Sequence, residues 1–152
     1  MLRQAFGSFA TGVTVVTTLD AKGNPVGLTA NSFSAVSLNP PLVLWCISLN
    51  TPSFAAFRDG SHYAINVLSA DQEEISNRFA TPSPDKFAGL DWKAGAGGVP
   101  VLNGCIANFE CRNVHQYPGG DHLIMVGQVE HYRANMDAPL LFFASKYAAL
   151  QP

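Results

Sequence analysis

One short segment of the chain combines small, hydroxyl-bearing and amide side chains in a way that suits ligand binding. Residues 27–34 read GLTANSFS and interrupt the middle one of three strands expected within residues 12–48. Such side chains pack poorly against a core, but they leave backbone N–H and C=O groups accessible to a flat polar ligand. Thr29, Asn31 and Ser32 are equally compatible with an edge strand facing water, so the residues alone leave both interpretations open.

A second candidate site lies at residues 48–53, which read SLNTPS. Hydroxyls and free N–H groups at a strand end that runs into a helix are suited to holding an anion such as a phosphate. The same pattern is also an ordinary helix N-cap, with Thr51 as the capping residue and Pro52 at the first helical position. Both interpretations remain open at this point.

Two isolated residues add possible chemistry. Lys86 follows Pro84 and Asp85 in a flexible segment, where it is either a solvated charge or a cation that closes over a phosphate. His122 follows Gly119, Gly120 and Asp121 at a turn, where its imidazole is either a bystander or a group that holds anions and carbonyls.

Other kinds of site fit the sequence poorly. Cys105 and Cys111 lie six residues apart in one expected strand, hence about 20 Å apart at about 3.3 Å per residue, so they cannot join His115 and His122 around one zinc ion. The glycines of residues 95–98 precede Val-Pro and complete no dinucleotide fingerprint. No serine or cysteine stands in a nucleophile elbow.

The expected elements are short strands with a few helices. Strands are predicted at residues 13–19 and 62–68, at 42–47 as a central strand buried on both faces, and at 105–114 and 123–133. A first helix is predicted from the helical spacing of residues 2–9 and should end near residues 11–12. Two more helices are predicted at residues 51–60 and 69–79. Residues 20–24 form a hairpin turn and residues 81–104 one long loop. This pattern predicts a small, mainly β, antiparallel barrel with helical covers.

Composition limits the possible partners. The chain has 152 residues, which fits a single domain over residues 1–152, and its net charge of −2 with no basic cluster argues against nucleic-acid binding. Only 13% of the residues are charged, which favours an apolar surface covered by another subunit. No apolar run is long enough to cross a membrane, and three cysteines, with Cys46 expected to be buried, suit a reducing, cytoplasmic location.

Several motifs taken together resemble the short-chain flavin reductase family, the reductase components of two-component flavin-dependent monooxygenases. They are FGSFATGVTVVTT, GLTANSFSAVSLNPPLVLWCIS, YAINVLSADQEEISNRFA, the loop with Lys86 and Phe87, the strand FECRN, and GDHLIMVGQVEHY. The resemblance extends over nearly the whole chain, from Leu2 to Tyr147. It implies the FMN-binding split β-barrel and a homodimer, while the ligand spacing given above already argues for no metal.

The resemblance also implies roles for individual residues. Residues 29–33 would line the flavin ring and its ribityl chain, residues 48–53 would handle the flavin phosphate, and the loop with Lys86 would close over the phosphate or the adenosine side. His122 would lie near the flavin and the nicotinamide as the catalytic group. Leu49 stands where relatives often carry a polar residue. The implied flavin-binding residues are Thr29, Ala30, Asn31, Ser32, Phe33, Ser48, Leu49, Asn50, Ser53, Phe79, Ala80, Lys86, Phe87 and His122.

The implied reaction is hydride transfer from NADH or NADPH to FMN or FAD, which supplies reduced flavin to a partner monooxygenase. This reaction needs little acid–base help, because the cofactors carry the electrons. The alternative is a split-barrel flavoprotein that holds FMN tightly and acts as an oxidase or a binding module. The sequence leaves open which flavin and which nicotinamide nucleotide are used.

Overall fold

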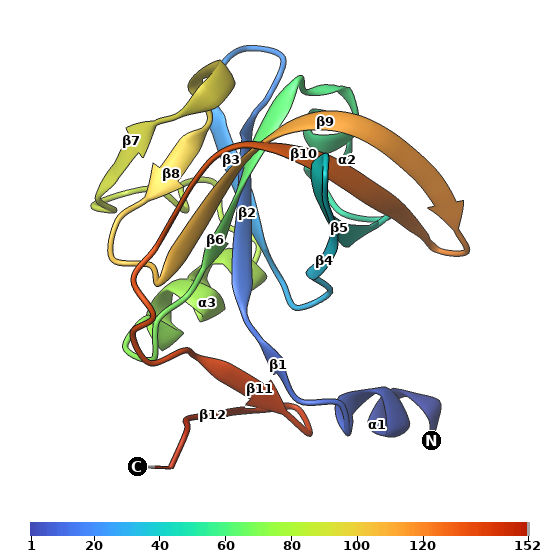
Figure 1. The fold of residues 1–152 in the computed structure, drawn as a ribbon, viewed down its shortest axis with the longest axis vertical. Helices are drawn as coiled ribbons and strands as arrows, with labels where there is room; N and C mark the ends of the chain where they lie inside the picture. Colours follow the sequence, from blue (N-terminus) through green and yellow to red (C-terminus); the bar gives the residue numbers. More distant parts are fainter. Residues whose placement is uncertain (152) are drawn as a thin grey trace.

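The structure, a computed structural model, describes residues 1–151 and is built on an antiparallel sheet of seven strands (Figure 1). Both halves of the sheet contribute to one core, which contains Trp45, Phe57 and Tyr63. The mainly β antiparallel barrel expected from the sequence is therefore confirmed. In hydrogen-bonded order, the strands are β3 (Pro25–Ala30), β2 (Thr14–Leu19), β6 (His62–Val67), β9 (Ala107–Gly119), β10 (His122–Ala134), β5 (Pro41–Ser48) and β4 (Ser34–Leu38).

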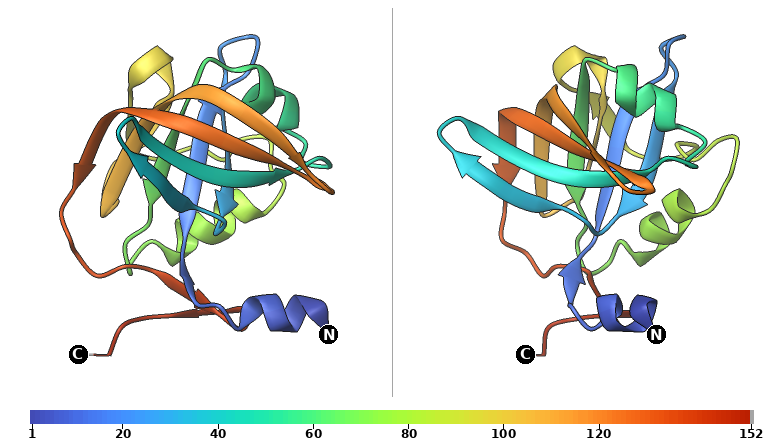
Figure 2. Two further views of the ribbon diagram at one scale, coloured as in Figure 1. Left: turned by 45° about the vertical axis from the view of Figure 1, so that its right-hand side comes forward. Right: turned by 90° about the vertical axis from the view of Figure 1, so that its right-hand side faces the viewer.

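The barrel is split between β3 and β4, which follow one another in the chain but form opposite edges of the sheet (Figure 2). Residues 31–33 cross from one edge to the other. The hydroxyl of Ser32 attaches this crossing to β5, because it accepts the Cys46 backbone N–H at 2.9 Å and donates to the Cys46 carbonyl at 3.3 Å. The polar segment noted in the sequence thus spans the open seam of a split barrel.

Two expectations for this region were wrong. The middle strand of the three is two separate strands, because the chain leaves one sheet edge at Ala30 and enters the other at Ser34. Strand β5 is not buried on both faces: Val43, Trp45 and Ile47 are buried, while the residues between them are partly exposed. Since only one face of a barrel strand meets the core, the Cys46 thiol lies on the opposite face and is half-buried rather than buried.

Helix α3 (Glu73–Ala80) packs across β3, and one glycine makes this contact possible. A Cβ at Gly27 would lie only 2.8 Å from Cε1 of Phe79, whose ring is buried against the strand. The hydroxyl of Thr29 donates to the Ser76 carbonyl of the helix at 2.7 Å. The C-terminal end of α3 is therefore fixed beside the seam.

Helix α2 (Phe54–Asp59) starts later than the sequence suggested. Thr51 and Pro52 belong to a preceding turn, in which the Thr51 carbonyl accepts the Phe54 N–H at 3.0 Å. Ser53 occupies the N-cap position without a side-chain cap hydrogen bond, so the prediction of Thr51 as the cap was wrong. No helix within residues 1–151 is long and apolar enough to cross a membrane.

The segment expected to be one long loop contains a small hairpin. Strand β7 (Trp92–Ala94) and strand β8 (Pro100–Leu102) pair around the short helix η1 (Ala96–Gly98). All three residues of β8 are buried. The loop prediction was therefore wrong for this part, since strands of three residues leave no periodic pattern among the surrounding glycines.

A buried amide network attaches this hairpin to the barrel. The side chain of Asn66 is fully buried; it donates to the Val15 carbonyl at 2.9 Å and accepts the Leu102 N–H at 3.0 Å. Its oxygen also accepts the side-chain amide of Asn108 at 2.7 Å. One side chain thus joins β2, β6, β8 and β9.

The last two long strands extend further than expected. Each has 13 residues, and they meet at a tight turn in which Gly120 has a positive φ of 67°. Residues 116–119, expected in the connection, belong to β9, because the two strands stay paired up to the turn. His122 is consequently the first residue of β10 and lies at the tip of this hairpin.

A terminal arm projects from the barrel and consists of α1 (Leu2–Gly7), β1 (Thr11–Gly12), β11 (Leu141–Phe143) and β12 (Lys146–Ala148) (Figure 2). The expected N-terminal helix is present but ends at Gly7, since the Ser8 hydroxyl and N–H both turn back to the Ala5 carbonyl. None of its residues is buried.

We predict that Asn66→Ala lowers the free energy of unfolding by about 3 kcal/mol, because it leaves buried donors without partners. Urea denaturation measures this change. The control Asn50→Ala, at an exposed side chain without a hydrogen bond, should change the free energy by less than about 0.5 kcal/mol. Equal effects of the two substitutions would show that the network does not support the fold.

Candidate functional site

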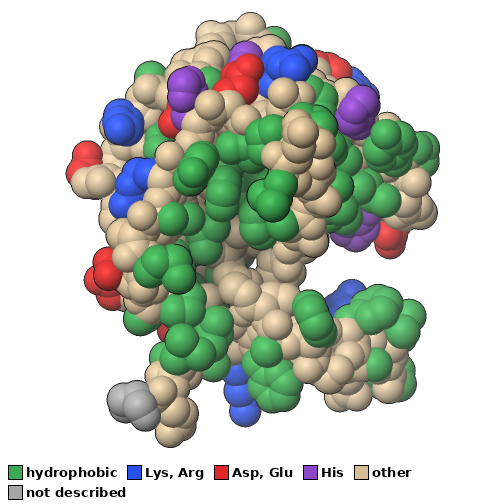
Figure 3. All heavy atoms as spheres, in the orientation of Figure 1, with side chains coloured by type: hydrophobic (Ala, Val, Ile, Leu, Met, Phe, Trp, Pro, Cys, Tyr) green, Lys and Arg blue, Asp and Glu red, His purple; other side chains and the backbone are tan. Residues whose placement is uncertain are grey.

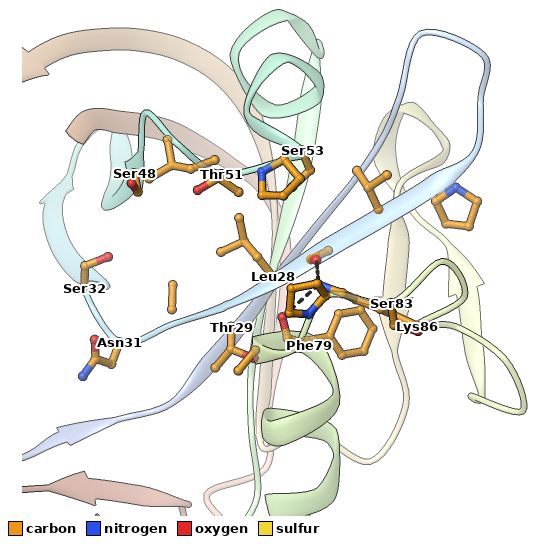
Figure 4. Close-up of a pocket in the computed structure, with 18 of the residues that line it drawn as sticks. Leu28, Thr29, Asn31, Ser32, Ser48, Thr51, Ser53, Phe79, Ser83 and Lys86 are labelled. Carbon is orange, nitrogen blue, oxygen red and sulfur yellow. Dashed lines mark hydrogen bonds between the residues drawn. The ribbon is translucent and has the colours of Figure 1, made fainter. Parts of the chain in front are cut away.

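A groove of about 720 Å³ opens along the seam of the barrel. Val26, Leu28 and Ala30 of β3 contribute apolar lining, and Phe79 stands at the C-terminal end of α3. Figure 4 shows the hydroxyls of the β5–α2 connection on one side of the groove and Lys86 on the other. The volume is that of a site for a nucleotide-sized molecule.

One end of the groove offers unpaired backbone. Residues 31–33 belong to no strand, and none of their backbone groups forms a hydrogen bond with another part of residues 1–151. The Ser32 and Thr29 hydroxyls, in contrast, are already engaged with Cys46 and Ser76. These two hydroxyls therefore hold the protein together, and hydrogen bonding to a ligand falls to the free backbone groups and to the exposed Asn31 amide.

The wall of the groove that is formed by the end of β5 and the turn before α2 carries a cluster of hydroxyls. Ser48 ends β5, and Thr51 and Ser53 lie in the turn before α2; all three line the groove (Figure 4). Helix α2 has only six residues, so its dipole contributes little. Binding of an anion here would therefore depend on hydroxyl and backbone donors rather than on a helix terminus.

Lys86 brings a positive charge to the groove. Its ammonium donates to the Phe79 carbonyl at 3.1 Å and to the Gly27 carbonyl at 3.4 Å, and it lies 6.0 Å from the centroid of the Phe79 ring. Burial lowers the pKa of Lys86. In the part of the chain that the structure describes, the groove is lined by no other lysine or arginine and by no carboxylate.

His122 stands next to Ser48 across the β5–β10 ladder and also lines the groove. Its Nδ1 lies 2.8 Å from Oδ1 of Asp121, and this hydrogen bond lowers the pKa of the Asp121 carboxyl. A carboxylate only accepts hydrogen bonds, so Nδ1 carries the proton. The Nε2 atom is therefore left to accept from, or when protonated to donate to, a molecule in the groove.

The structure brings most of the site residues predicted from the sequence to this one groove. Three lie outside its lining: Phe33 stacks on Phe109 with ring centroids 5.6 Å apart, and Leu49 and Asn50 are exposed beyond the end of β5. Those within the lining are Thr29, Ala30, Asn31, Ser32, Ser48, Ser53, Phe79, Ala80, Lys86, Phe87 and His122.

The predicted set omitted several lining residues. Val26 and Leu28 were missed because their apolar pattern indicates core, although both are only partly buried. Cys46 was assigned to the core because the apolar run of β5 shows no alternation of polarity; in the strand it lies on the face opposite the buried Trp45 and lines the groove. Ser83 lies in the loop before Lys86, and apart from this position nothing in the sequence indicates that it lines the groove.

Comparison with known proteins agrees with this geometry. Residues 6–151 match the model of the flavin reductase like domain. The chain is 47% identical to an FMN reductase (NADH) of Agrobacterium fabrum over 92% of this chain and 79% of that protein. It superposes on an NADH:FAD oxidoreductase of Streptomyces globisporus, solved with NAD and FAD fragments, with a TM-score of 0.94 and 38% identity, over 99% of this chain and 92% of that one.

Other curated relatives are longer than this chain. The chain is 44% identical to the reductase component of the flavin-dependent trigonelline monooxygenase of Acinetobacter baylyi, over 96% of this chain but only 47% of that protein. The chain therefore spans about half the length of several of the curated relatives that it matches.

Proposed function

Because this chain belongs to the flavin reductase-like family, we propose that it is an NAD(P)H-dependent flavin reductase that binds its flavin in the groove along the seam. The reaction is hydride transfer from the nicotinamide C4 of NADH or NADPH to N5 of FMN or FAD. The observation that carries the proposal is the composition of the groove. Its lining is apolar, one end offers unpaired backbone groups, and the other end offers hydroxyls and Lys86.

The residues present fit a flavin. A planar ring with polar edges suits the free backbone groups of residues 31–33 and the Asn31 amide. The Ser53 hydroxyl and the Lys86 ammonium suit a phosphate, since a charge-assisted hydrogen bond is the stronger kind. Other residues of the predicted set that line the groove would shape it: Ala30 and Phe79 are apolar walls, and the Ser32 hydroxyl holds the seam in place.

His122 is the proposed catalytic group. Its Nδ1 is hydrogen-bonded to Asp121, which leaves Nε2 free for a partner in the groove. From there it would hold the nicotinamide over the flavin ring, because keeping the two at about 3 to 3.5 Å is the main catalytic task in hydride transfer.

The names of relatives support the proposed substrates and partner. An FMN reductase (NADH) and an NADH:FAD oxidoreductase stand among the similar proteins, which favours NADH as donor and keeps both flavins as candidates. Reductase components of flavin-dependent monooxygenases are also among them, so the reduced flavin would pass to a monooxygenase partner. The cysteines are free thiols, which fits the cytoplasm as the proposed location.

We also propose a homodimer formed through the terminal arm. Leu2, Phe6 and Phe9 are 69%, 72% and 78% exposed, and Figure 3 shows a hollow between the arm and the barrel. A second copy would cover these side chains. We predict twice the mass of one chain by light scattering at micromolar concentration, and a shift toward the monomer mass in Phe6→Ser/Phe9→Ser. A monomer in the unaltered protein would contradict this.

The activity is tested by mixing the protein with NADH and an excess of FMN or FAD in air and following nicotinamide absorbance. We expect rapid oxidation through many turnovers of flavin, saturating with added flavin. Absence of oxidation with either flavin and with NADH or NADPH, in a folded protein, would contradict the proposal. Flavin that stays bound through gel filtration and is reduced only slowly would favour the alternative of a tightly bound flavoprotein.

Within this assay, His122→Ala should lower turnover by about a hundredfold, the size expected when the reacting rings are misplaced by about 1 Å. His115→Ala is the matched control, because His115 is exposed and lies outside the groove lining. Unchanged turnover in His122→Ala would remove His122 from the mechanism.

We predict that Lys86→Met weakens FMN binding about tenfold, as expected for a lost charge-assisted hydrogen bond, and leaves riboflavin binding unchanged. Fluorescence titration measures both. The Lys86 ammonium is present only below its pKa, and burial lowers that pKa. As the pH rises, the preference for FMN over riboflavin should therefore begin to fall at a pH below the usual lysine pKa of about 10.4. Equal weakening of both ligands would show that Lys86 shapes the groove without binding phosphate.

A further inference from the structure

Helix α3 determines where Lys86 lies, because two residues of its last turn hold the segment that carries this lysine. The Phe79 carbonyl accepts from the Lys86 ammonium at 3.1 Å (Figure 4). The Arg78 guanidinium donates to the backbone carbonyls of Lys86 and Ala88 at 3.4 and 3.0 Å. The ammonium also donates to the Gly27 carbonyl of β3 at 3.4 Å, so it bridges helix and strand. A shift of α3 against β3 would therefore displace this cation.

The position of α3 against β3 is fixed at Ser76, which is fully buried. Its carbonyl accepts the Thr29 hydroxyl of β3 at 2.7 Å. Its hydroxyl lies 2.6 Å from Oη of Tyr147. Because Tyr147 donates its own proton to Oδ1 of Asn77 at 3.0 Å, the Ser76 hydroxyl is the donor to Tyr147. One tyrosine hydroxyl thus holds two successive residues of the helix.

Tyr147 belongs to the terminal arm and not to the barrel. It lies in β12 opposite Phe142 of β11, and the two rings pack edge to face with centroids 5.4 Å apart. Strand β11 in turn pairs with β1. The segment that leads into the arm is attached just ahead of α3, where the Ala70 N–H donates to the Ala138 carbonyl at 2.8 Å. Within residues 1–151, no element of the arm lines the groove, so its contact with the site runs through α3.

We propose that Tyr147 is a positioning residue for flavin binding: through Ser76 it fixes α3 against β3, and this keeps the Lys86 ammonium where it meets the phosphate of FMN or FAD. The inference rests on the proposed function, and it gives the terminal arm a part in substrate binding. The arm acts on the phosphate end of the groove only. The ring end, at residues 31–33, is fixed to β5 by the Ser32 hydroxyl and does not depend on the arm.

The test removes one hydroxyl. Tyr147→Phe keeps the ring that packs on Phe142, so the variant should fold. Kd is measured for FMN and for riboflavin by fluorescence titration, and KM for FMN and kcat are measured with NADH. We expect Kd and KM for FMN to rise about fivefold, the size of one hydrogen bond, while riboflavin binding and kcat stay unchanged. The matched control is Tyr132→Phe, at a 73% exposed tyrosine of β10 outside the groove lining, and it should change none of these constants.

A double-substitution cycle tests the route through Ser76. If Tyr147 acts through the Ser76 hydroxyl, the variant with both Ser76→Ala and Tyr147→Phe binds FMN about as well as the weaker of the two single variants. Multiplied effects in the combined variant, an unchanged Kd for FMN in Tyr147→Phe, or an equal rise for FMN and riboflavin would overturn the proposal. Failure of the unaltered protein to bind and reduce FMN would instead refute the proposed function, so the two failures are distinguishable.

Discussion

The constraint on which the rest of the structure depends is the unpaired seam of the barrel. Because β3 and β4 are successive in the chain and lie at opposite edges of one sheet, residues 31–33 must cross the gap without strand partners. Exposed sheet edges are usually blocked or covered in soluble proteins. Here the Ser32 hydroxyl fixes the crossing to β5, so the backbone at the seam is held in place yet keeps free hydrogen-bonding groups.

The other parts of the site are arranged along this seam. Gly27 allows Phe79 and the end of α3 to approach β3, Lys86 satisfies the Phe79 carbonyl, and the β9–β10 turn places His122 beside Ser48. The groove contains a cation, hydroxyls and one imidazole, but no carboxylate lines it within residues 1–151. Such a donor set suits binding and orientation of two planar cofactors, which is the protein's part when the cofactors carry the electrons.

Sequence reasoning succeeded where a local pattern determines the structure. The turn chemistry of residues 20–24 predicted the β2–β3 hairpin, and the strand predicted at residues 62–68 is β6. It failed where long-range contacts decide: the apolar run in β5 contains no sign that only one face meets the core, and β8 is held by Asn66, which is far away in the chain. The residues predicted for the site came mainly from ordered motifs, whereas the structural hydrogen bonds of Thr29 and Ser32 became evident only from their partners in the structure.

The most direct test of this account is a crystal structure of the protein with FMN. We predict the ring against the backbone of residues 31–33 with one edge near Asn31, the phosphate between Ser53 and Lys86, and Nε2 of His122 facing the exposed side of the ring. A flavin bound away from the seam, or a seam whose backbone groups make no contact with bound flavin, would contradict the account.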